Sequence, residues 1–427
     1  MSEYNLLWRR YGLKENPFFV DPLTISGDVP LSLFVGRISE RNELGNIIRT
    51  GEARCLVVGY PGVGKTSLVN FVRSEAAKSA FFTPIREIEI NRKMPGNEFI
   101  ILTISAIYDT IKSNGISLPR ELAQKLDALY ELTRYGELTP EIANLSYLNR
   151  QKLTDLFKEL INKIVYPRFK GVILHYDNLD NIENPEDLLE LISDIRDFIL
   201  TKKIVYIFVG DSFLPSTIFQ KTRVSSVFLT PAIEINKFSY EETIKILEQR
   251  LDYMRISETS RVIPPYSEGA IKKLYDLYEG NLRDILTSLT TCVKETAQSN
   301  SPILMTDESV QDILYEKVRK NILSKLSTEE RKIVQIMLNW GGHMTPTELS
   351  KQSKKIIQSI SSTYLPKLIE VGAVRFKQAE GRNRFYEVTP VMKWAKLQRS
   401  ERQKMESKEK MRQEVTKIIN RSLSEFL

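Results

Sequence analysis

The alternation of apolar and polar positions divides the chain into an amino-terminal part with strands and a helical remainder. In residues 1–235, short apolar runs alternate with long amphipathic stretches of helical periodicity, which is the rhythm of a sheet flanked by helices. Four runs have the length and composition of strands, at 55–58, 87–90, 172–176 and 204–209. The last two are almost continuously apolar, as expected of strands covered on both faces. The pattern predicts an α/β core built on a parallel sheet.

Beyond residue 237 helical spacing replaces the strand pattern, and a second small domain follows the helical stretch. Three helices and a hairpin are expected in this domain, at 327–339, from 346, at 357–371 and at 374–388. Thr345 is the expected cap of the second helix, and Pro346 its first residue. This order of elements predicts a winged helix. The chain is therefore expected to have five parts, which are an N-terminal segment, the core, a helical domain, the winged helix and a charged helical tail, at 1–32, 33–236, 237–318, 319–392 and 393–427.

Composition excludes several classes of protein. The 427 residues contain no uncharged apolar run of the roughly 18 residues that a membrane-spanning helix needs, and the amino terminus has no basic and apolar secretory pattern. Two cysteines and two histidines are too few for a disulfide framework and argue against a Cys/His zinc site. We therefore expect a cytoplasmic protein of a reducing compartment that has no membrane partner.

The positive charge is concentrated at the carboxyl end. The net charge of the chain is +7, but residues 320–427 hold 22 Lys/Arg against 11 Asp/Glu, so the preceding part is slightly acidic. Clustered cations bind polyanions because neutralising phosphates releases condensed counterions. The charge distribution therefore favours double-stranded DNA as a partner, while a solvated face and tail remain the alternative.

A phosphate-binding loop follows the first strand. The sequence GYPGVGKTS at 59–67 fits G-x-x-x-x-G-K-[ST] between a strand and a helix. Its backbone N–H groups and the helix start would surround the phosphates, with contributions from Gly59, Pro61, Gly62, Val63, Gly64 and Ser67. Lys65 would reach the β- and γ-phosphates, and the Thr66 hydroxyl would ligate Mg²⁺. The motif predicts binding of ATP or ADP.

Polar residues at the ends of two later strands complete this site. Asp177 ends the third apolar run and would hold Mg²⁺ with Thr66. An enzyme that hydrolyses ATP quickly usually has glutamate at the next position, where it orients the attacking water. This chain has Asn178 there, and an amide cannot take a proton. Asp180 either takes over the role of the missing carboxylate or caps the following helix. At the end of the fourth strand, Asp211 would contact the water or Ser212 the γ-phosphate. The expected activity is slow ATP hydrolysis.

The order of these elements resembles that of the AAA+ ATPases, and most of all the archaeal and eukaryotic origin-recognition (Orc/Cdc6-type) initiators. Residues 33–41 are similar to the segment whose backbone packs on adenine in that family, which implies such contacts for Val35, Gly36 and Arg37. The resemblance implies an AAA+ P-loop core, an all-α lid and a C-terminal winged helix. Asn178 departs from the family pattern, and residues 91–148 show nothing that can be aligned with it.

The resemblance also assigns two arginines. Residues 221–228 look like the family's arginine–serine–serine box, which implies that Arg223 is an arginine finger supplied to a neighbouring subunit. Residues 280–284 are similar to the second sensor, which implies that Arg283 lies over the phosphates, and 238–250 resembles the entry to the lid. The implied partner is another copy of the chain or a related AAA+ subunit. Surface ion pairing is the alternative role of both arginines.

A winged helix would place its third helix in the major groove and its wing along the backbone. The candidate contacts on the helix and its approach are Lys354, Lys355, Gln358, Ser361, Ser362 and Thr363, and those on the wing are Arg382 and Arg384. Pro366 inside this helix predicts a kink. Together, the features favour an ATP-controlled, DNA-binding protein of the replication-initiator class with slow ATPase activity. The alternatives are a signalling ATPase whose winged helix contacts protein and a DNA-binding ATPase of a transposon or plasmid.

Overall fold

The computed structural model describes residues 3–132, 149–182, 184–228, 230–296, 304–380 and 383–395 of the 427. The chain divides into two compact units by its contacts. The core unit comprises residues 1–262 and 280–287, and the C-terminal unit comprises 263–279 and 288–427. The five parts expected from the sequence stay a prediction. No helix in the described ranges is long and apolar enough to cross a membrane.

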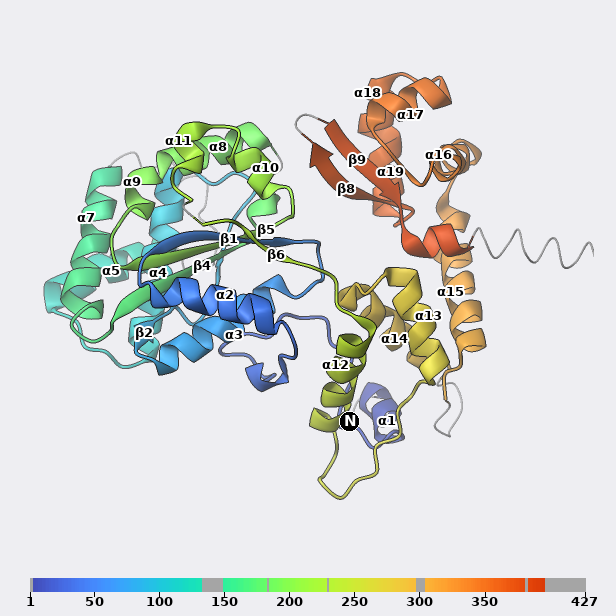
Figure 1. Cartoon of the computed structure of the whole chain (residues 1–427), viewed down its shortest axis with the longest axis horizontal. Helices are drawn as coiled ribbons and strands as arrows, with labels where there is room; N and C mark the ends of the chain where they lie inside the picture. The colour runs from blue at the N-terminus through green and yellow to red at the C-terminus, as the bar shows by residue number, and fades with distance from the viewer. Residues whose placement is uncertain are drawn as a thin grey trace, which may run out of the picture. The chain divides into compact units, whose positions relative to one another are not determined.

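A parallel sheet forms the centre of the core unit (Figure 1). Its spatial order is β2-β4-β5-β1-β6 with β3 beside β4, and its strands are β1 (Ala53–Gly59), β2 (Phe81–Phe82), β3 (Ile88–Glu89), β4 (Gly171–Asp177), β5 (Ile204–Gly210) and β6 (Ile233–Ile235). Every residue of β1, β4 and β5 is buried, which confirms these three predicted strands. Because the strands are parallel, their carboxyl ends meet at one edge.

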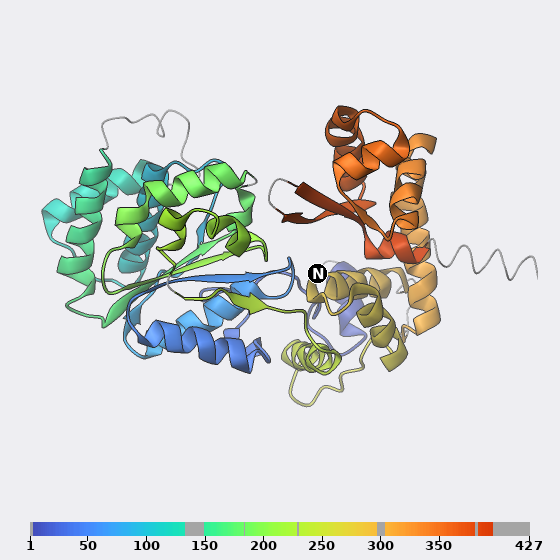
Figure 2. The same ribbon diagram turned by 45° about the horizontal axis from the view of Figure 1, so that its top comes forward.

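Helices cover both faces of the sheet (Figures 1 and 2). One face carries α2 (Ile38–Arg49) and α3 (Lys65–Lys78). The other carries the helices between β3 and β5, which are α4 (Gly96–Ser113), α5 (Arg120–Leu132), α7 (Arg150–Leu160), α8 (Pro185–Asp194) and α9 (Arg196–Ile199). Val57 of β1 packs with the α2–α3 layer, and its neighbours Leu56 and Val58 pack on the opposite side, as strand alternation requires. The predicted fold class, a parallel sheet between two helical layers, is confirmed.

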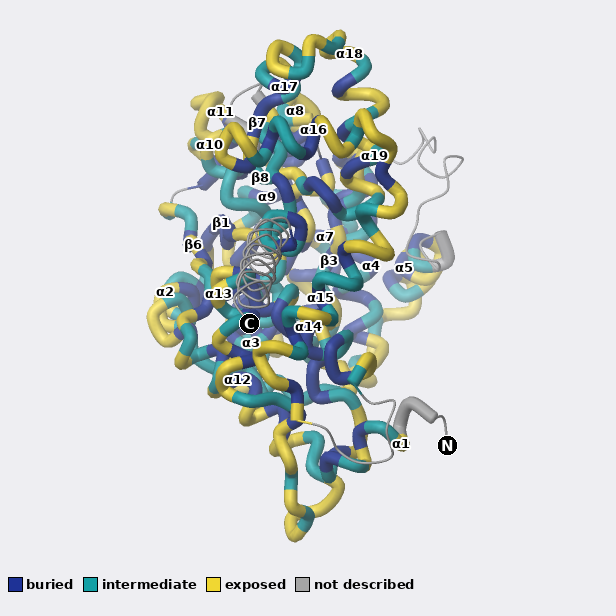
Figure 3. The backbone as a smooth tube through the Cα atoms, turned by 90° about the vertical axis from the view of Figure 1, so that its right-hand side faces the viewer, coloured by how far each residue is buried: buried dark blue, intermediate teal, exposed yellow. Residues whose placement is uncertain are grey.

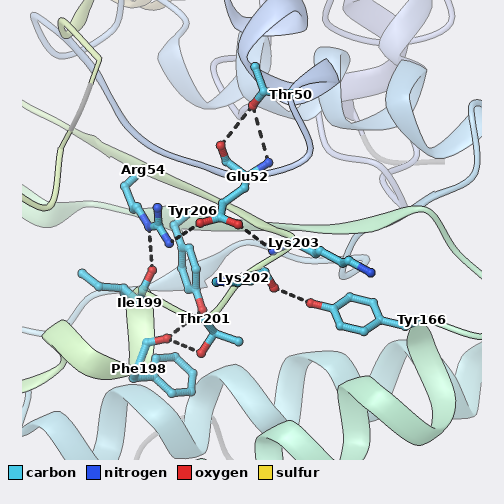
Figure 4. Close-up of polar contacts among 10 residues, drawn as sticks. All are labelled: Thr50, Glu52, Arg54, Tyr166, Phe198, Ile199, Thr201, Lys202, Lys203 and Tyr206. Atoms are coloured by element: carbon cyan, nitrogen blue, oxygen red, sulfur yellow. Dashed lines mark hydrogen bonds and ion pairs between the residues drawn. The ribbon is translucent and has the colours of Figure 1, made fainter.

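A polar cluster ties β1 to the segment that leads into β5 (Figure 4). Arg54 Nη2 lies 3.1 Å from Glu52 Oε1, and Arg54 Nε donates to the carbonyl of Ile199 at 2.8 Å. The other carboxylate oxygen of Glu52 accepts from the backbone N–H of Lys203 at 3.2 Å. These contacts lie at the amino ends of the strands, the edge opposite to the phosphate-binding loop, and pair the buried Arg54 guanidinium.

The N-terminal segment is an integral part of the core unit. The side chains of Trp8, in α1 (Glu3–Arg9), and of Tyr11 and Phe18, which follow this helix, are buried. The backbone pairs with the end of α12 (Tyr240–Tyr253), since Lys14 N donates to the carbonyl of Met254. The remaining short helices of the unit are η1 (Leu31–Leu33), a π-helical turn η2 (Ile161–Val165), η3 (Leu179–Asn181), α10 (Leu214–Ile218) and α11 (Thr222–Ser225).

The C-terminal unit contains helices and one small antiparallel sheet. Its helices are α13 (Glu268–Tyr278), α15 (Asp307–Asn321), η4 (Leu323–Lys325), α16 (Thr328–Asn339), α17 (Pro346–Ser353) and α19 (Leu365–Glu370), while α14 (Leu282–Thr296) has residues in both units. The sheet has the order β7-β9-β8, with β7 (His343–Met344), β8 (Val374–Glu380) and β9 (Asn383–Val388). Thr345 caps α17 with its side chain, and Pro346 is the first helical residue, as predicted. The helix and strand order is the one expected of a winged helix.

The third helix of this domain is not a regular α-helix. It begins as α18 (Ile357–Ser359), continues as a π-helical turn η5 (Ile360–Tyr364) and ends as α19. Pro366 has no backbone N–H to donate to a carbonyl of the preceding turn, which accounts for the wider turn before it. The irregularity expected at Pro366 therefore takes the form of a π-turn. The start of this helix is mostly exposed (Figure 3).

Candidate functional site

The phosphate-binding loop connects β1 to α3 at the carboxyl edge of the sheet. Gly62 and Gly64 both have left-handed backbone conformations, with φ of +85° and +89°. A Cβ on Gly62 would lie 2.6 Å from Asn281 Oδ1 and 2.8 Å from Arg283 Cβ. Glycine is therefore required at position 62 both by its backbone and by the close approach of residues 281–283.

Lys65 lies among several charged groups of this edge. Its Nζ donates to the carbonyls of Gly59 at 2.8 Å and Tyr60 at 3.2 Å. Burial lowers the pKa of Lys65, the carboxylates of Asp180, Asp211 and Asp177 oppose this effect, and the charge of Arg283 adds to it. Charged residues after β4 and β5 and at the start of α14 thus influence the lysine of the loop.

Asp177 and Thr66 form a pair of adjacent oxygen ligands. Thr66 Oγ1 donates to Asp177 Oδ2 at 2.8 Å, and the other carboxylate oxygen accepts from the backbone N–H of Asn178 at 3.0 Å. Burial raises the pKa of Asp177 to about 6, against the effect of these hydrogen bonds. No group of three or more His, Cys, Asp and Glu side chains that could hold a metal occurs in the described ranges. The pair instead fits Mg²⁺, which commonly takes one or two protein oxygens and completes its shell with phosphate and water.

Asn178, Asp180 and Asp211 follow the ends of β4 and β5, at the same edge of the sheet as Asp177. Asn178 and Asp180 are exposed and line the pocket at the loop, and Asn178 has a left-handed backbone with φ of +60°. Asp180 Oδ1 lies close to Gly210, since a Cβ added to Gly210 would be 3.1 Å from this oxygen. Asp211 accepts a hydrogen bond from Ser212 Oγ at 3.0 Å; burial raises its pKa, and the charge of Asp180 contributes.

The two arginines suggested by the resemblance have different positions. Arg283 lines the pocket together with Pro61, and the neighbouring Asn281 donates from Nδ2 to the carbonyl of Pro61 at 3.0 Å. Arg223 is exposed on α11 and is not part of the pocket lining. The structure therefore brings Arg283, but not Arg223, to the loop of its own chain.

The segment expected to pack on adenine lies behind the loop. Arg37 is 5% exposed, donates from Nη2 to the carbonyls of Val63 (3.3 Å) and Asn236, and its guanidinium carbon lies 4.0 Å from the centre of the Phe238 ring. Val35, Gly36 and Arg37 are not among the lining residues. The side chain of Arg37 thus links the loop to the residue after β6 by donating to backbone carbonyls of both.

Residues that the sequence analysis did not select complete the pocket wall. They are Val20, Asp21, Pro22, Arg250, Leu282 and Leu286. Nothing in the pattern of 20–22 indicates a binding segment. The sequence could have indicated Arg250, because this residue lies on the apolar face of its helix with Ile246 and Leu247. A charged side chain is unusual on such a face.

Most of the predicted DNA contacts on the third helix and its approach are exposed. Lys354 and the candidates of the third helix are exposed, namely Gln358, Ser361, Ser362 and Thr363. Lys355 is instead held by Glu329, with Nζ 3.0 Å from Oε2, and it packs on the ring of Tyr364. Arg384 lies exposed on β9, and Arg382 lies outside the described residues.

Comparisons with known proteins match one segment of the chain to a family model and most of the chain to solved structures. Residues 33–198 match the family model described as an AAA ATPase domain. The chain is similar to solved structures of Aeropyrum pernix ORC1 in complex with DNA (14% identity, 87% of this chain and 94% of that one, TM-score 0.47), A. pernix ORC2 in ADPNP–ADP complexes (15%, 89% and 96%, 0.49) and Pyrobaculum aerophilum Cdc6p (16%, 87% and 99%, 0.44). No curated protein matches the chain. The match at 33–198 covers the phosphate-binding loop and Asp177, and it agrees with the AAA+ part of the resemblance seen in the sequence.

Proposed function

We propose that the chain binds Mg²⁺–ATP at the loop around Lys65 and that its nucleotide state controls how its winged helix engages duplex DNA. The contact between Thr66 and Asp177 carries the proposal, because it places the two expected Mg²⁺ ligands side by side next to the lysine of the loop. Arg283, on the same pocket, supplies a second cation for the phosphates. When bound, Mg²⁺ would neutralise charge on the β- and γ-phosphates.

ATP hydrolysis by this site is proposed to be slow. Asn178 occupies the position where a carboxylate would orient the attacking water, and an amide has no basic function at neutral pH. Asp180, which lines the pocket, and Asp211, which follows β5, are the candidate substitutes. Arg223 is exposed on α11, a position compatible with supply to another subunit, and we propose this role for it.

DNA engagement is proposed for the third helix and wing of the C-terminal unit. Support comes from the excess of cations in residues 320–427 and from the exposure of Lys354 and the neutral hydrogen-bonding side chains that follow it. One observation favours a protein partner instead. Ile356 and Ile357, at the start of the helix, are 73% and 45% exposed, which is more typical of a protein contact.

Two binding measurements test the proposal. ATP affinity is compared between the wild type and Lys65→Ala, with Lys78→Ala, an exposed lysine at the other end of α3, as the matched control. We expect only Lys65→Ala to lose ATP binding. Duplex binding measured at increasing salt then separates the partners: a steep loss of affinity indicates phosphate contacts, and absence of binding at low salt rejects the DNA role.

A further inference from the structure

Arg250 is a buried cation without an acidic partner. It is 7% exposed, and within the described part of the chain its contacts are a hydrogen bond from Nη1 to the carbonyl of Phe19 and the ring of Phe19, 4.0 Å from the guanidinium carbon. Burial alone lowers its pKa to about 10. A guanidinium has five N–H donors, and burying such a charge without pairing is costly. The position therefore has capacity for a further ligand.

This side chain lines the same pocket as the phosphate-binding loop. Arg250, Val20 and Pro22 contribute to the pocket wall together with Lys65 and Thr66. Within the described residues, the hydrogen bond and the ring contact of Arg250 are both with Phe19 and not with the loop. Arg250 can therefore serve the part of a bound nucleotide that extends beyond the phosphates held by the loop.

The wall is also fixed to the helix that carries the loop. The backbone N–H of Leu23 donates to Ser67 Oγ at 3.0 Å, and Asn70 Nδ2 donates to the carbonyl of Leu23 at 3.0 Å. Residues 19–23 therefore run from Arg250 on α12 to Ser67 on α3, and both ends of this short stretch are held. A wall held in this way is preorganised, which lowers the entropy cost of binding a ligand against it.

We propose that Arg250, supported by Phe19, is the residue that contacts the purine base of the bound nucleotide. One face of the planar guanidinium packs on the Phe19 ring, and the opposite face and the remaining N–H groups are suited to an aromatic base with ring-nitrogen acceptors. This role rests on the proposed binding of nucleotide at Lys65. It makes the N-terminal segment part of the base site, in addition to the loop that holds the phosphates.

The test compares ligands with and without a base. Titration calorimetry measures ATP, ADP and inorganic tripolyphosphate binding to the wild type, Arg250→Met and Lys245→Met, the last an exposed control on the same helix. We expect Arg250→Met to weaken ATP and ADP by about tenfold each and to leave tripolyphosphate unchanged. Lys245→Met should change none of the three affinities.

Two outcomes would overturn the assignment. They are unchanged ATP affinity in Arg250→Met, or an equal loss for tripolyphosphate, which would make Arg250 a phosphate contact. If Arg250→Met does not fold, Arg250→Lys and Phe19→Leu are measured with the same ligands and judged by the same two outcomes. A wild type that binds neither ATP nor tripolyphosphate would instead reject the proposed nucleotide site itself, and the base contact with it.

Discussion

Thr66 Oγ1 and Asp177 Oδ2 lie 2.8 Å apart and join the first turn of α3 to the end of β4. This hydrogen bond joins the two atoms that Mg²⁺ would coordinate, so the two expected ligands are adjacent. Their positions follow from the parallel pairing of β4 with β5 and of β5 with β1, which brings the ends of distant segments to one edge.

The affinity for Mg²⁺–ATP should depend on pH through Asp177. Burial raises its pKa to about 6, so the carboxylate is ionised above that pH and becomes protonated as the pH falls through it. Because only the ionised form is a good metal ligand, affinity should fall by up to about tenfold per pH unit below about 6. Titrations between about pH 5 and pH 8 check this. Equal affinities at both ends, or an unchanged pH dependence in Asp177→Asn, would disprove it.

Replacing Asn178 by glutamate should accelerate ATP hydrolysis. The residue is exposed at the pocket next to Asp177, so a carboxylate there has room to orient water. We expect turnover per subunit to rise by about a hundredfold, the lower end of the range of general-base effects. Asn178→Gln is the matched control and should remain slow. A wild type that is already fast and does not respond to Asn178→Glu contradicts the role given to Asn178.

Residual hydrolysis should depend on Asp180 more than on Asp211. Asp180 is exposed at the pocket, whereas Asp211 is half-buried and accepts a hydrogen bond from Ser212. Asp180→Asn should lower turnover by about tenfold and Asp211→Asn by less. Single-turnover phosphate release measures both. A larger loss in Asp211→Asn would assign the water-positioning role to that residue instead.

Arg73 should contribute strongly to stability. It is fully buried on α3 and contacts His175 Nδ1 at 2.9 Å, Asn70 Oδ1 at 2.9 Å and Thr83 Oγ1 at 2.8 Å. Arg73→Ala leaves a cavity and several buried groups unpaired, so the free energy of unfolding should fall by about 3 kcal/mol or more. The exposed Lys78→Ala should change it by less than about 0.5 kcal/mol. Denaturant unfolding of both variants decides, and similar values would contradict the structure here.

Lys354 should matter more than Lys355 for DNA affinity. Lys354 is exposed, whereas Lys355 is paired with Glu329 and would have to leave that carboxylate to reach phosphate. Lys354→Ala should therefore weaken duplex binding and reduce its salt dependence by about one counterion, and Lys355→Ala should have a smaller effect. Glu329→Gln should strengthen binding. The reverse order of the two lysine variants in salt titrations would show that the pair opens on DNA.

Much of the core could be predicted from the sequence because its signals are local. The strands ending at Gly59, Asp177 and Gly210 are long apolar runs, and the loop motif fixes Lys65 and Thr66 between a strand and a helix. The two- and three-residue edge strands β2 and β6 have no such signal, since only pairing with longer neighbours defines them.

The rest of the site depends on contacts between segments far apart in the sequence. The backbone contact of Arg37 with the base stays a prediction, and its side chain holds the carbonyls of Val63 and Asn236, which no sequence pattern indicates. The wall of the pocket includes residues 20–22 and Arg250, more than 200 positions apart, which no local pattern could pair. Lys355 likewise matches a DNA-contact pattern, but its ion pair with Glu329 is visible only in the fold.

The most direct test of the account is the affinity for duplex DNA measured with ATP, with ADP and without nucleotide, in the wild type and in Lys65→Ala. If the nucleotide at this loop controls DNA engagement, the wild type should show different affinities in the ATP and ADP states, and Lys65→Ala should show one value that nucleotide does not change. The same DNA affinity for the wild type in all three conditions, with ATP binding confirmed in the same samples, would contradict it.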